Sequence, residues 1–204
     1  MSGEPLLKGQ GREHRRAEYP VDPQFLDRWS PRAMSGEEIS QEELMSLFEA
    51  ARWAPSSYNA QPWRMLYALR SSESWPTFFG LLVPGNQAWA QKAAALVLFL
   101  SRTINDRTGK PSISHSFDAG AAWGYFALQG SLLGLAVHGM QGFDYARAQS
   151  ELRIPSDVRV EAMIAVGRPA SRESLPSGLR EREFPSDRRS LNETVCEGPW
   201  ALPG

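Results

Sequence analysis

The segment from Ala54 to Arg64 is the part of the chain richest in groups able to bind a ligand. Its sequence, APSSYNAQPWR, places two prolines around neutral hydrogen-bonding side chains, namely Ser56, Ser57, Asn59 and Gln61. Hydroxyl and amide groups in such a loop present donors and acceptors to a polar, planar ligand without adding charge. The alternative is a stiff turn in which the same groups cap the backbone.

A second candidate binding segment is RWSPR, residues 28–32. Alternate side chains of an extended chain point the same way, so Arg28, Ser30 and Arg32 are expected to share one face. Two guanidinium groups around a hydroxyl suit a phosphate monoester. Arg188 and Arg189 add a third cationic group near the C-terminus. An exposed, solvated stretch is the alternative for both segments.

The overall composition excludes several other functions. The 204 residues include 22 Lys and Arg against 23 Asp and Glu, so a net charge of −1 offers no field that would attract nucleic acid. The single Cys196 cannot form an intramolecular disulfide, and no secretory signal is recognised, which favours a cytoplasmic protein. The three His are scattered without HExxH or CxxC spacing, so no zinc site is expected.

Common catalytic motifs are also missing from the sequence. It contains no GxSxG elbow, no GxxxxGK[ST] loop and no GxGxxG turn, and no nucleophile stands beside an obvious base. An enzyme with this sequence would therefore need a cofactor to supply the reactivity.

Several helices and strands are predicted to position these residues. Ser40 and Glu43 form a capping box, and the apolar spacing that follows predicts a helix over 41–54, before Pro55. Short apolar runs predict strands over 64–69, 94–101 and 160–166. Helices are expected around 75–82 and 86–93, with a polar loop over 103–114.

Residues 119–143 form a run without Asp, Glu, Lys or Arg. Glycines and polar residues within the run argue against a membrane span. We expect one long central helix, apolar on all faces because it is covered on all faces. Its glycines at positions 120, 124, 130 and 134 predict close approach of a second helix, and hence a homodimer with this helix at the two-fold axis. A core helix within a monomer is the alternative.

The two ends of the chain differ from its middle. Residues 1–25 are expected to form a polar arm, in which Pro20 and Pro23 prevent regular helix. Residues 26–204 are expected to form one domain. Within it, residues 170–204 are rich in Pro, Arg, Glu and Ser and predict an extended tail, either disordered or wrapped over a partner.

The order of several segments resembles the nitroreductase-like flavoprotein family over about residues 26–196. These segments are RWSPRAM, LFEAARWAPSSYNAQPWRML, PGNQAWAQKAAALVLFL, AVGRP and PSDRRSLNETV, together with the uncharged run. The resemblance implies an α+β fold with a central, mostly antiparallel sheet flanked by helices. It also implies an intertwined homodimer, a C-terminal tail extending to the partner subunit, and FMN bound at the interface.

The resemblance further implies which residues bind FMN. Arg28, Ser30 and Arg32 would hold its phosphate and reach the flavin pyrimidine edge, with Arg188 or Arg189 near the phosphate. A loop from the other subunit would line the isoalloxazine and ribityl chain, and the segment after the long helix would approach flavin N5. The complete implied set is Arg28, Trp29, Ser30, Arg32, Pro55, Ser56, Ser57, Asn59, Asn86, Gln141, Gly142, Arg188 and Arg189.

Two positions depart from the family pattern. Some members have Glu where this chain has Gln141, and Lys where it has Trp89. Both differences bear on the potential of the flavin and its reactivity with oxygen. Trp89 and Trp123 are candidates for aromatic walls of a substrate pocket, with core packing as the alternative.

The function implied is an FMN-dependent NAD(P)H oxidoreductase without a catalytic side chain, because the flavin carries the chemistry. It would use ping-pong hydride transfer through N5 to a small-molecule acceptor such as a nitroaromatic, a quinone or another planar electrophile. No nucleic-acid or membrane partner is expected. The alternatives are an FMN storage or sensor dimer without turnover, a specialised flavin reaction such as flavin cleavage or dehalogenation, and a structural homodimer without cofactor.

Overall fold

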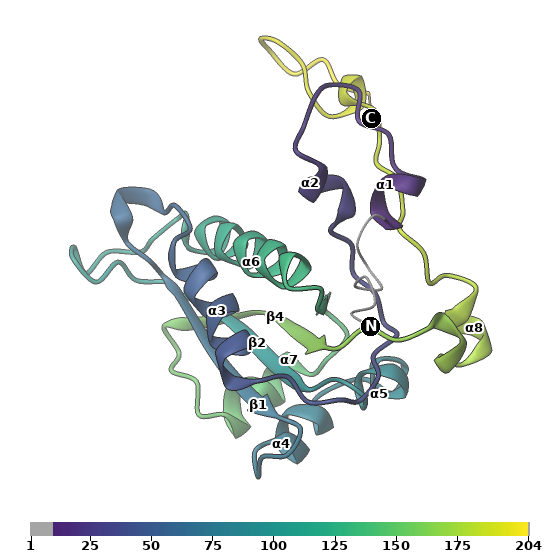
Figure 1. Cartoon of the computed structure of the whole chain (residues 1–204). Coiled ribbons are helices and arrows are strands. Elements are labelled where there is room, and N and C mark those ends of the chain that lie inside the picture. The colour runs from purple at the N-terminus through teal and green to yellow at the C-terminus, as the bar shows by residue number, and fades with distance from the viewer. Residues whose placement is uncertain (1–9, 204) are drawn as a thin grey trace.

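Four strands form one antiparallel sheet at the centre of the chain (Figure 1). The structure is a computed structural model that describes residues 10–203. The strands are β1 (Trp63–Leu69), β2 (Ala95–Arg102), β3 (Ala136–Met140) and β4 (Val158–Gly167), in the order β1-β2-β4-β3. Every neighbouring pair is antiparallel. The expected α+β class with an antiparallel sheet is confirmed, and the three predicted strands are present.

The sheet is covered by helices on both faces. Leu96 and Leu98 of β2 pack into one core cluster, whereas Val97 and Phe99 pack into the other, as expected for side chains that alternate along a strand. On one face lie α3 (Gln41–Arg52) and α6 (His115–Leu132), and on the other α4 (Trp75–Gly80), α5 (Pro84–Ala90) and α7 (Tyr145–Glu151). Because both faces are covered, β2 is apolar along its length rather than alternating.

The helix α3 begins where its sequence predicts. The Ser40 hydroxyl accepts from the Glu43 N–H at 3.0 Å, and the Glu43 carboxylate accepts from the Ser40 N–H at 2.7 Å. These two bonds satisfy N–H groups that the first turn leaves unpaired. The helix ends at Arg52, so the chain leaves it shortly before Pro55.

The prediction of one helix over residues 119–143 is wrong. The helix α6 ends at Leu132, Gly134 turns the chain at φ +70°, and the second half of the run forms β3. A left-handed residue stops a helix, and glycine adopts that conformation without strain. An uncharged run shows that a segment is buried but does not distinguish one long helix from a helix followed by a strand.

The helix α6 is also not covered on all faces within one chain. Phe117 is 82% exposed and Leu132 is 64% exposed, and Tyr125 is partly exposed. Its glycines do not share one environment either. A Cβ atom on Gly130 would lie 2.3 Å from Val137 Cγ2, whereas one on Gly120 would meet nothing within 4 Å. Gly130 therefore permits close packing against β3 of the same chain, and Leu47 of α3 would also lie within 3.5 Å of that Cβ atom.

This contrast predicts opposite effects of alanine at the two glycines. Gly130→Ala is expected to lower the free energy of unfolding by about 1 to 3 kcal/mol, because its methyl group overlaps Val137. Gly120→Ala is expected to raise it by up to about 1 kcal/mol, because alanine favours helix and meets no neighbour in this chain. Urea unfolding of both variants checks this, and equal midpoints would contradict the packing of Gly130.

The N-terminal arm contains helices that the sequence analysis did not expect. These are α1 (Gln10–His14) and α2 (Pro23–Asp27), while residues 1–9 lie outside the described part of the chain. Pro23 occupies the first turn of α2, where its missing N–H has no helical partner to lose, and the Asp22 side chain accepts from the Gln24 N–H. The expectation that Pro23 prevents helix is therefore wrong.

The arm and the C-terminal tail lie side by side and extend away from the sheet (Figure 1). The Arg15 guanidinium donates to the Ser186 carbonyl at 2.8 Å, and the Leu191 N–H donates to the Glu18 carboxylate at 3.0 Å. The tail contains a short helix, α8 (Ser177–Arg180), before it runs along the arm. Among residues 10–203, no helix has both the length and the apolar character needed to cross a membrane.

Candidate functional site

A cavity of about 410 Å³ lies where the arm, β3 and the tail meet, and we call it the arginine pocket. Five arginines from distant parts of the sequence line it, with Ser30, His138 and Gly139 among the other lining residues. The arginines are Arg15, Arg28, Arg32, Arg182 and Arg188. No acidic side chain is among the described residues that line it. The pocket is therefore suited to an anion.

The segment after α2 brings three of the predicted site residues to this pocket. The helix ends at Asp27, and Arg28 continues in an extended conformation with φ −66° and ψ 117°. Arg28, Ser30 and Arg32 all line the pocket, and the Arg28 guanidinium donates to the Ser30 hydroxyl at 3.3 Å. The site thus presents guanidinium groups and a hydroxyl together, which is the donor set a phosphate needs.

The arginines of this pocket repel one another. Burial lowers the pKa of Arg28, and the charge of Arg188 lowers it further. Burial also lowers the pKa of Arg15, with further lowering by Arg188 and then Arg28. In both arginines, burial and neighbouring positive charge therefore disfavour the charged form of the guanidinium in the folded chain. A bound anion would relieve this repulsion, so the electrostatics favour a filled pocket.

Two of the five arginines, Arg15 in the arm and Arg182 in the tail, were not predicted as site residues. Arg15 is only 7% exposed, and its guanidinium donates to the carbonyls of Leu26, Arg28 and Ser186, so it fastens the arm to the tail. Neither arginine belongs to a spaced motif in the sequence. They reach the pocket only because the two ends of the chain pair with each other, and no local sequence pattern predicts that pairing.

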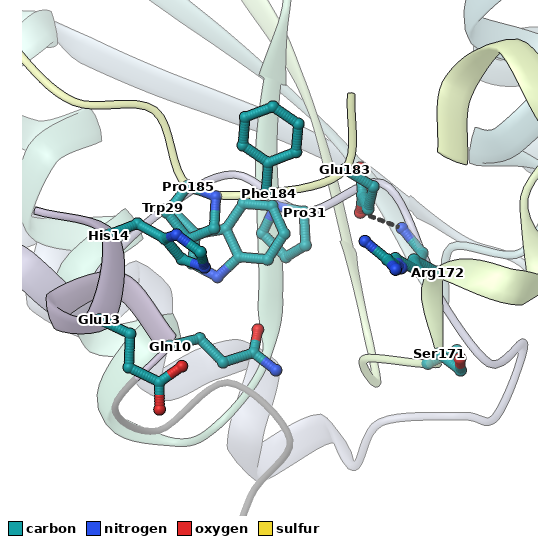
Figure 2. A pocket seen from close by; sticks show the side chains of 12 residues that line it. Gln10, Glu13, His14, Trp29, Pro31, Ser171, Arg172, Glu183, Phe184 and Pro185 are labelled. Carbon is teal, nitrogen blue, oxygen red and sulfur yellow. Dashed lines mark hydrogen bonds between the residues drawn. The ribbon is translucent and has the colours of Figure 1, made fainter. Parts of the chain in front are cut away.

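Glu183 anchors the tail beside the arginine pocket. Its carboxylate accepts from the Arg32 N–H at 2.5 Å and from the Ala33 N–H at 2.8 Å. Arg32 Nη1 lies 3.6 Å from the other carboxylate oxygen. Glu183 also lines a cavity of about 340 Å³. Figure 2 shows side chains of this lining, among them Trp29, Phe184 and Glu183. Trp29 thus contributes to both cavities.

His138 lies in the arginine pocket as a neutral imidazole. Burial lowers its pKa to about 4, and the charges of Arg32 and then Arg28 contribute to the lowering. Its Nδ1 is 3.3 Å from the Pro31 carbonyl, and its ring packs on Trp89 at 4.7 Å between centroids. An uncharged ring can lie among arginines without adding to their repulsion.

The pKa of His138 predicts a loss of stability in mild acid. In the unfolded chain a His titrates near 6.5, so below that pH the unfolded state takes up a proton that the folded state refuses. The free energy of unfolding should fall by about 1.5 kcal/mol between pH 6.5 and pH 5 on this account. Urea unfolding of wild type and His138→Gln across this range measures it. Parallel pH curves for the two proteins would contradict the prediction.

A second cavity, which we call the apolar pocket, adjoins the arginine pocket. It measures about 690 Å³ and shares Arg28, Ser30 and Gly139 with it. Trp123, Met140 and Gln141 contribute an aromatic ring, a thioether and an amide to its wall. Trp123 therefore lines a pocket, whereas Trp89 is 3% exposed and packs in the core.

Asn86 and Gly142 contact each other outside these pockets. The Asn86 amide donates to the Gly142 carbonyl at 3.0 Å, and a Cβ atom on Gly142 would lie 2.7 Å from that amide nitrogen. This contact holds the segment that follows β3 and carries Gln141. Arg189 lines a different cavity, between arm and tail, which Arg188 also reaches. Only Arg188 of this pair therefore lines the arginine pocket.

The loop of Pro55, Ser56, Ser57 and Asn59 lies at the start of α6, whereas the apolar pocket lies along the later turns of that helix. The Ser57 N–H donates to the buried Asp118 carboxylate at 3.3 Å. Tyr58, Asn59 and Gln61 have φ angles of 51°, 54° and 48°. Left-handed backbone at neighbouring non-glycine residues is strained and is concentrated at functional sites. Within one chain this loop does not line the apolar or arginine pocket.

The fold and these cavities define an α+β protein in which a pocket lined by arginines adjoins an apolar one. The model of the nitroreductase family matches residues 26–75. A crystallised oxidoreductase containing FMN is 47% identical, with a TM-score of 0.89 and coverage of 93% of this chain and 97% of that protein. The chain belongs to the nitroreductase family.

Two other relatives agree with this membership. A protein from Desulfovibrio desulfuricans, crystallised in complex with FMN, is 25% identical with a TM-score of 0.70, and the match covers 91% of this chain and 100% of that one. An NADH dehydrogenase from Thermus thermophilus is 28% identical, and the match covers 83% of this chain and 92% of the relative.

Proposed function

We propose that this chain is an FMN-dependent oxidoreductase that takes electrons from NADH or NADPH. The observation that carries the proposal is the arginine pocket, which adjoins a cavity large enough for a flavin ring. Support comes from relatives whose names mention FMN and NADH. The names of the relatives do not say which residues of this chain could bind FMN, whereas the arginine pocket supplies such residues.

The residues of the two cavities fit FMN. Guanidinium groups of Arg28 and Arg188, with the Ser30 hydroxyl, supply the donors for a terminal phosphate. Trp123 and Met140 supply flat, polarisable walls, and the Gln141 amide supplies a hydrogen-bonding group for a polar ring edge. Bound FMN would accept and donate hydride at N5.

In this proposal the side chains bind the flavin and adjust its reduction potential, and none of them reacts with the substrate. Arg32 keeps a cation near the cavity, and a cation stabilises negative charge on a reduced ring. None of the described residues that line the apolar pocket is an Asp, Glu or His, so protons for the acceptor would come from solvent. The acceptor we propose is a nitroaromatic, a quinone or another planar electrophile that can stack against the ring.

We also propose that a homodimer completes the site. The loop of Pro55, Ser56, Ser57 and Asn59 lies away from the arginine and apolar pockets of its own chain, so it would line the flavin of a second copy. The exposed apolar side chains of α6 and the protruding arm and tail provide surface for that contact. In this arrangement each copy would contribute its loop to the flavin site of the other copy and extend its tail over that copy.

Anaerobic reduction tests the proposed function. Purified protein should be yellow, should bleach on addition of NADH or NADPH, and should regain its colour when a quinone or nitroaromatic is added. Bound FMN that neither nucleotide reduces would instead indicate a storage or sensor protein. Protein that stays colourless and takes up no added FMN would refute both flavin functions.

A further inference from the structure

Asp118 is a buried carboxylate in the first turn of α6, where it is 3% exposed. Its Oδ2 accepts from the hydroxyl of Ser114, just before the helix, at 3.0 Å. The same oxygen accepts at 3.3 Å from the N–H of Ser57, which lies 61 residues earlier in the chain. Asp118 therefore joins α6 to the loop over residues 55–61, which we call the strained loop.

The burial of Asp118 disfavours folding more than that of the other buried acids. Within the described part of the chain these are Asp27, which pairs with Arg12, and Glu183, which pairs with Arg32. Asp118 forms no ion pair there. A buried carboxylate without a cation lowers stability unless hydrogen bonds compensate. The first turn of a helix favours negative charge, but an exposed carboxylate would gain the same benefit. Burial is therefore explained by the contact with the strained loop rather than by the helix.

The strained loop needs contacts that fix its shape. Its three left-handed residues have φ angles of 48° to 54°, and such conformations persist only where surrounding contacts hold them. Within the loop, the Gln61 N–H donates to the Ser56 hydroxyl at 3.0 Å. From outside, the exposed Arg107 guanidinium donates to the Tyr58 carbonyl at 3.3 Å. Asp118 adds a buried contact, which solvent competes for less.

The strained loop keeps polar side chains available for a ligand. The hydrogen bonds that Ser57 and Asn59 make among residues 10–203 use main-chain atoms. The Ser57 hydroxyl and the Asn59 side-chain amide thus have no partner within the described chain. Because the loop lines neither the arginine pocket nor the apolar pocket of its own copy, these groups suit the flavin of a second copy.

Asp118 also lies next to the surface that we assign to the second copy. Phe117, the preceding residue, is 82% exposed in one copy and belongs to the apolar side chains of α6 proposed for the dimer contact. The carboxylate is therefore at the junction between that contact and the strained loop.

The helix α6 also connects Asp118 to the apolar pocket of its own copy. Trp123 lines that pocket and follows Asp118 by about one and a half turns. Loss of Asp118 could thus weaken FMN binding in two ways. It could act through the strained loop at the flavin of the second copy, or through α6 at the flavin of the same copy.

We propose that Asp118 is a positioning residue for the flavin site of the second copy. In each copy it holds the strained loop in the shape that presents the Ser57 hydroxyl and the Asn59 amide to FMN in the other copy. This inference rests on the proposed function, because it requires bound FMN and a site shared between two copies.

Substitutions of Asp118 in the homodimer are the first test. Asp118→Ala should bind FMN at least tenfold more weakly in fluorescence titration of the apoprotein, and the Ser57 amide should exchange at least tenfold faster. Asp118→Asn keeps an oxygen that can accept from Ser57 and Ser114, so its affinity should lie between those of Asp118→Ala and wild type. Ser40→Ala is the matched control, because it removes a helix cap at the opposite end of α3 from the strained loop. It should lower the urea midpoint without changing FMN affinity.

Mixed dimers then distinguish the two routes. Two differently tagged chains are co-expressed, and dimers carrying both tags are titrated with FMN. In the first dimer, one chain carries Asp118→Ala and the other carries Arg28→Ala. We expect one site of wild-type affinity, formed by the intact arginine pocket of one chain and the intact loop of the other. In the second dimer, one chain carries both substitutions and its partner is wild type. We expect two weakened sites and none of wild-type affinity.

The opposite pattern would overturn the proposal. Two weakened sites in the first dimer and one wild-type site in the second would mean that Asp118 acts on the flavin of its own copy. Unchanged FMN affinity in Asp118→Ala would also refute the role of Asp118 while leaving the proposed function intact. Wild-type protein that binds no FMN would instead refute the proposed function and this role with it. If Asp118→Ala does not assemble, Asp118→Asn replaces it in both mixed dimers and the same two patterns decide.

Discussion

An Arg28→Ala variant is expected to bind FMN about 10 to 150 times more weakly than wild type, a loss of about 1.5 to 3 kcal/mol. Arg28 lines both the arginine pocket and the apolar pocket. In the proposed complex its guanidinium would therefore lie near the FMN phosphate, at the end of the ribityl group. Removing it takes away a charge-assisted hydrogen bond. Fluorescence titration of the apoprotein with FMN measures the change.

Two further variants distinguish a specific contact of the Arg28 guanidinium from an effect of the protein's net charge. Arg28→Lys keeps the cation but loses the planar fork, so it should have an affinity between those of wild type and Arg28→Ala. Lys92→Ala removes one positive charge from an exposed site outside the arginine and apolar pockets, and it should leave FMN affinity unchanged. Equal affinities of Arg28→Ala and wild type would contradict the proposed phosphate site.

The Arg28→Ala substitution should not lower the stability of the protein without FMN. The pKa of Arg28 is lowered by burial and by Arg188, so its charged form is disfavoured in the folded state without a ligand. Its removal relieves repulsion within the arginine pocket. Weaker FMN binding combined with an unchanged or higher urea midpoint would distinguish a binding residue from a structural one.

Local sequence signals predicted three of the four strands, β1, β2 and β4, and the helices α3, α4 and α5. The capping box at Ser40 and Glu43 marks the start of α3, and the apolar run around Leu96 to Leu100 marks β2. In each case the physical cause is local, because a cap satisfies nearby N–H groups and a doubly covered strand must be apolar throughout. Gly134 shows the limit, since burial alone did not reveal where helix gives way to strand.

The candidate site was only partly predictable because it depends on contacts between distant segments. Arg28, Ser30 and Arg32 follow from one motif, whereas Arg15 and Arg182 reach the pocket through the pairing of arm and tail. Arg188 lines the pocket and Arg189 does not, and the tail that carries both is held by contacts such as that of Glu183 with Arg32, 151 residues apart along the sequence. Spacing rules describe one helix or strand and do not describe such a contact.

A Glu183→Ala variant is expected to release the tail. The Glu183 side chain is 2% exposed, accepts from two backbone N–H groups and faces Arg32. Removing a buried, paired carboxylate that leaves its donors unsatisfied typically lowers stability by about 3 to 5 kcal/mol. Here the loss should fall mainly on the contact between the tail and residues 32–33, because Glu183 joins those segments directly.

Hydrogen exchange and FMN binding together test this expectation. The amides of Arg32 and Ala33 should exchange at least a hundredfold faster in Glu183→Ala, and a protease should cut the released tail sooner. FMN should also bind more weakly, because Arg182 and Arg188 leave the arginine pocket with the tail. Glu183→Gln keeps an acceptor oxygen for the two N–H groups and should have a smaller effect. Unchanged exchange and FMN affinity in Glu183→Ala would mean that Glu183 does not fasten the tail.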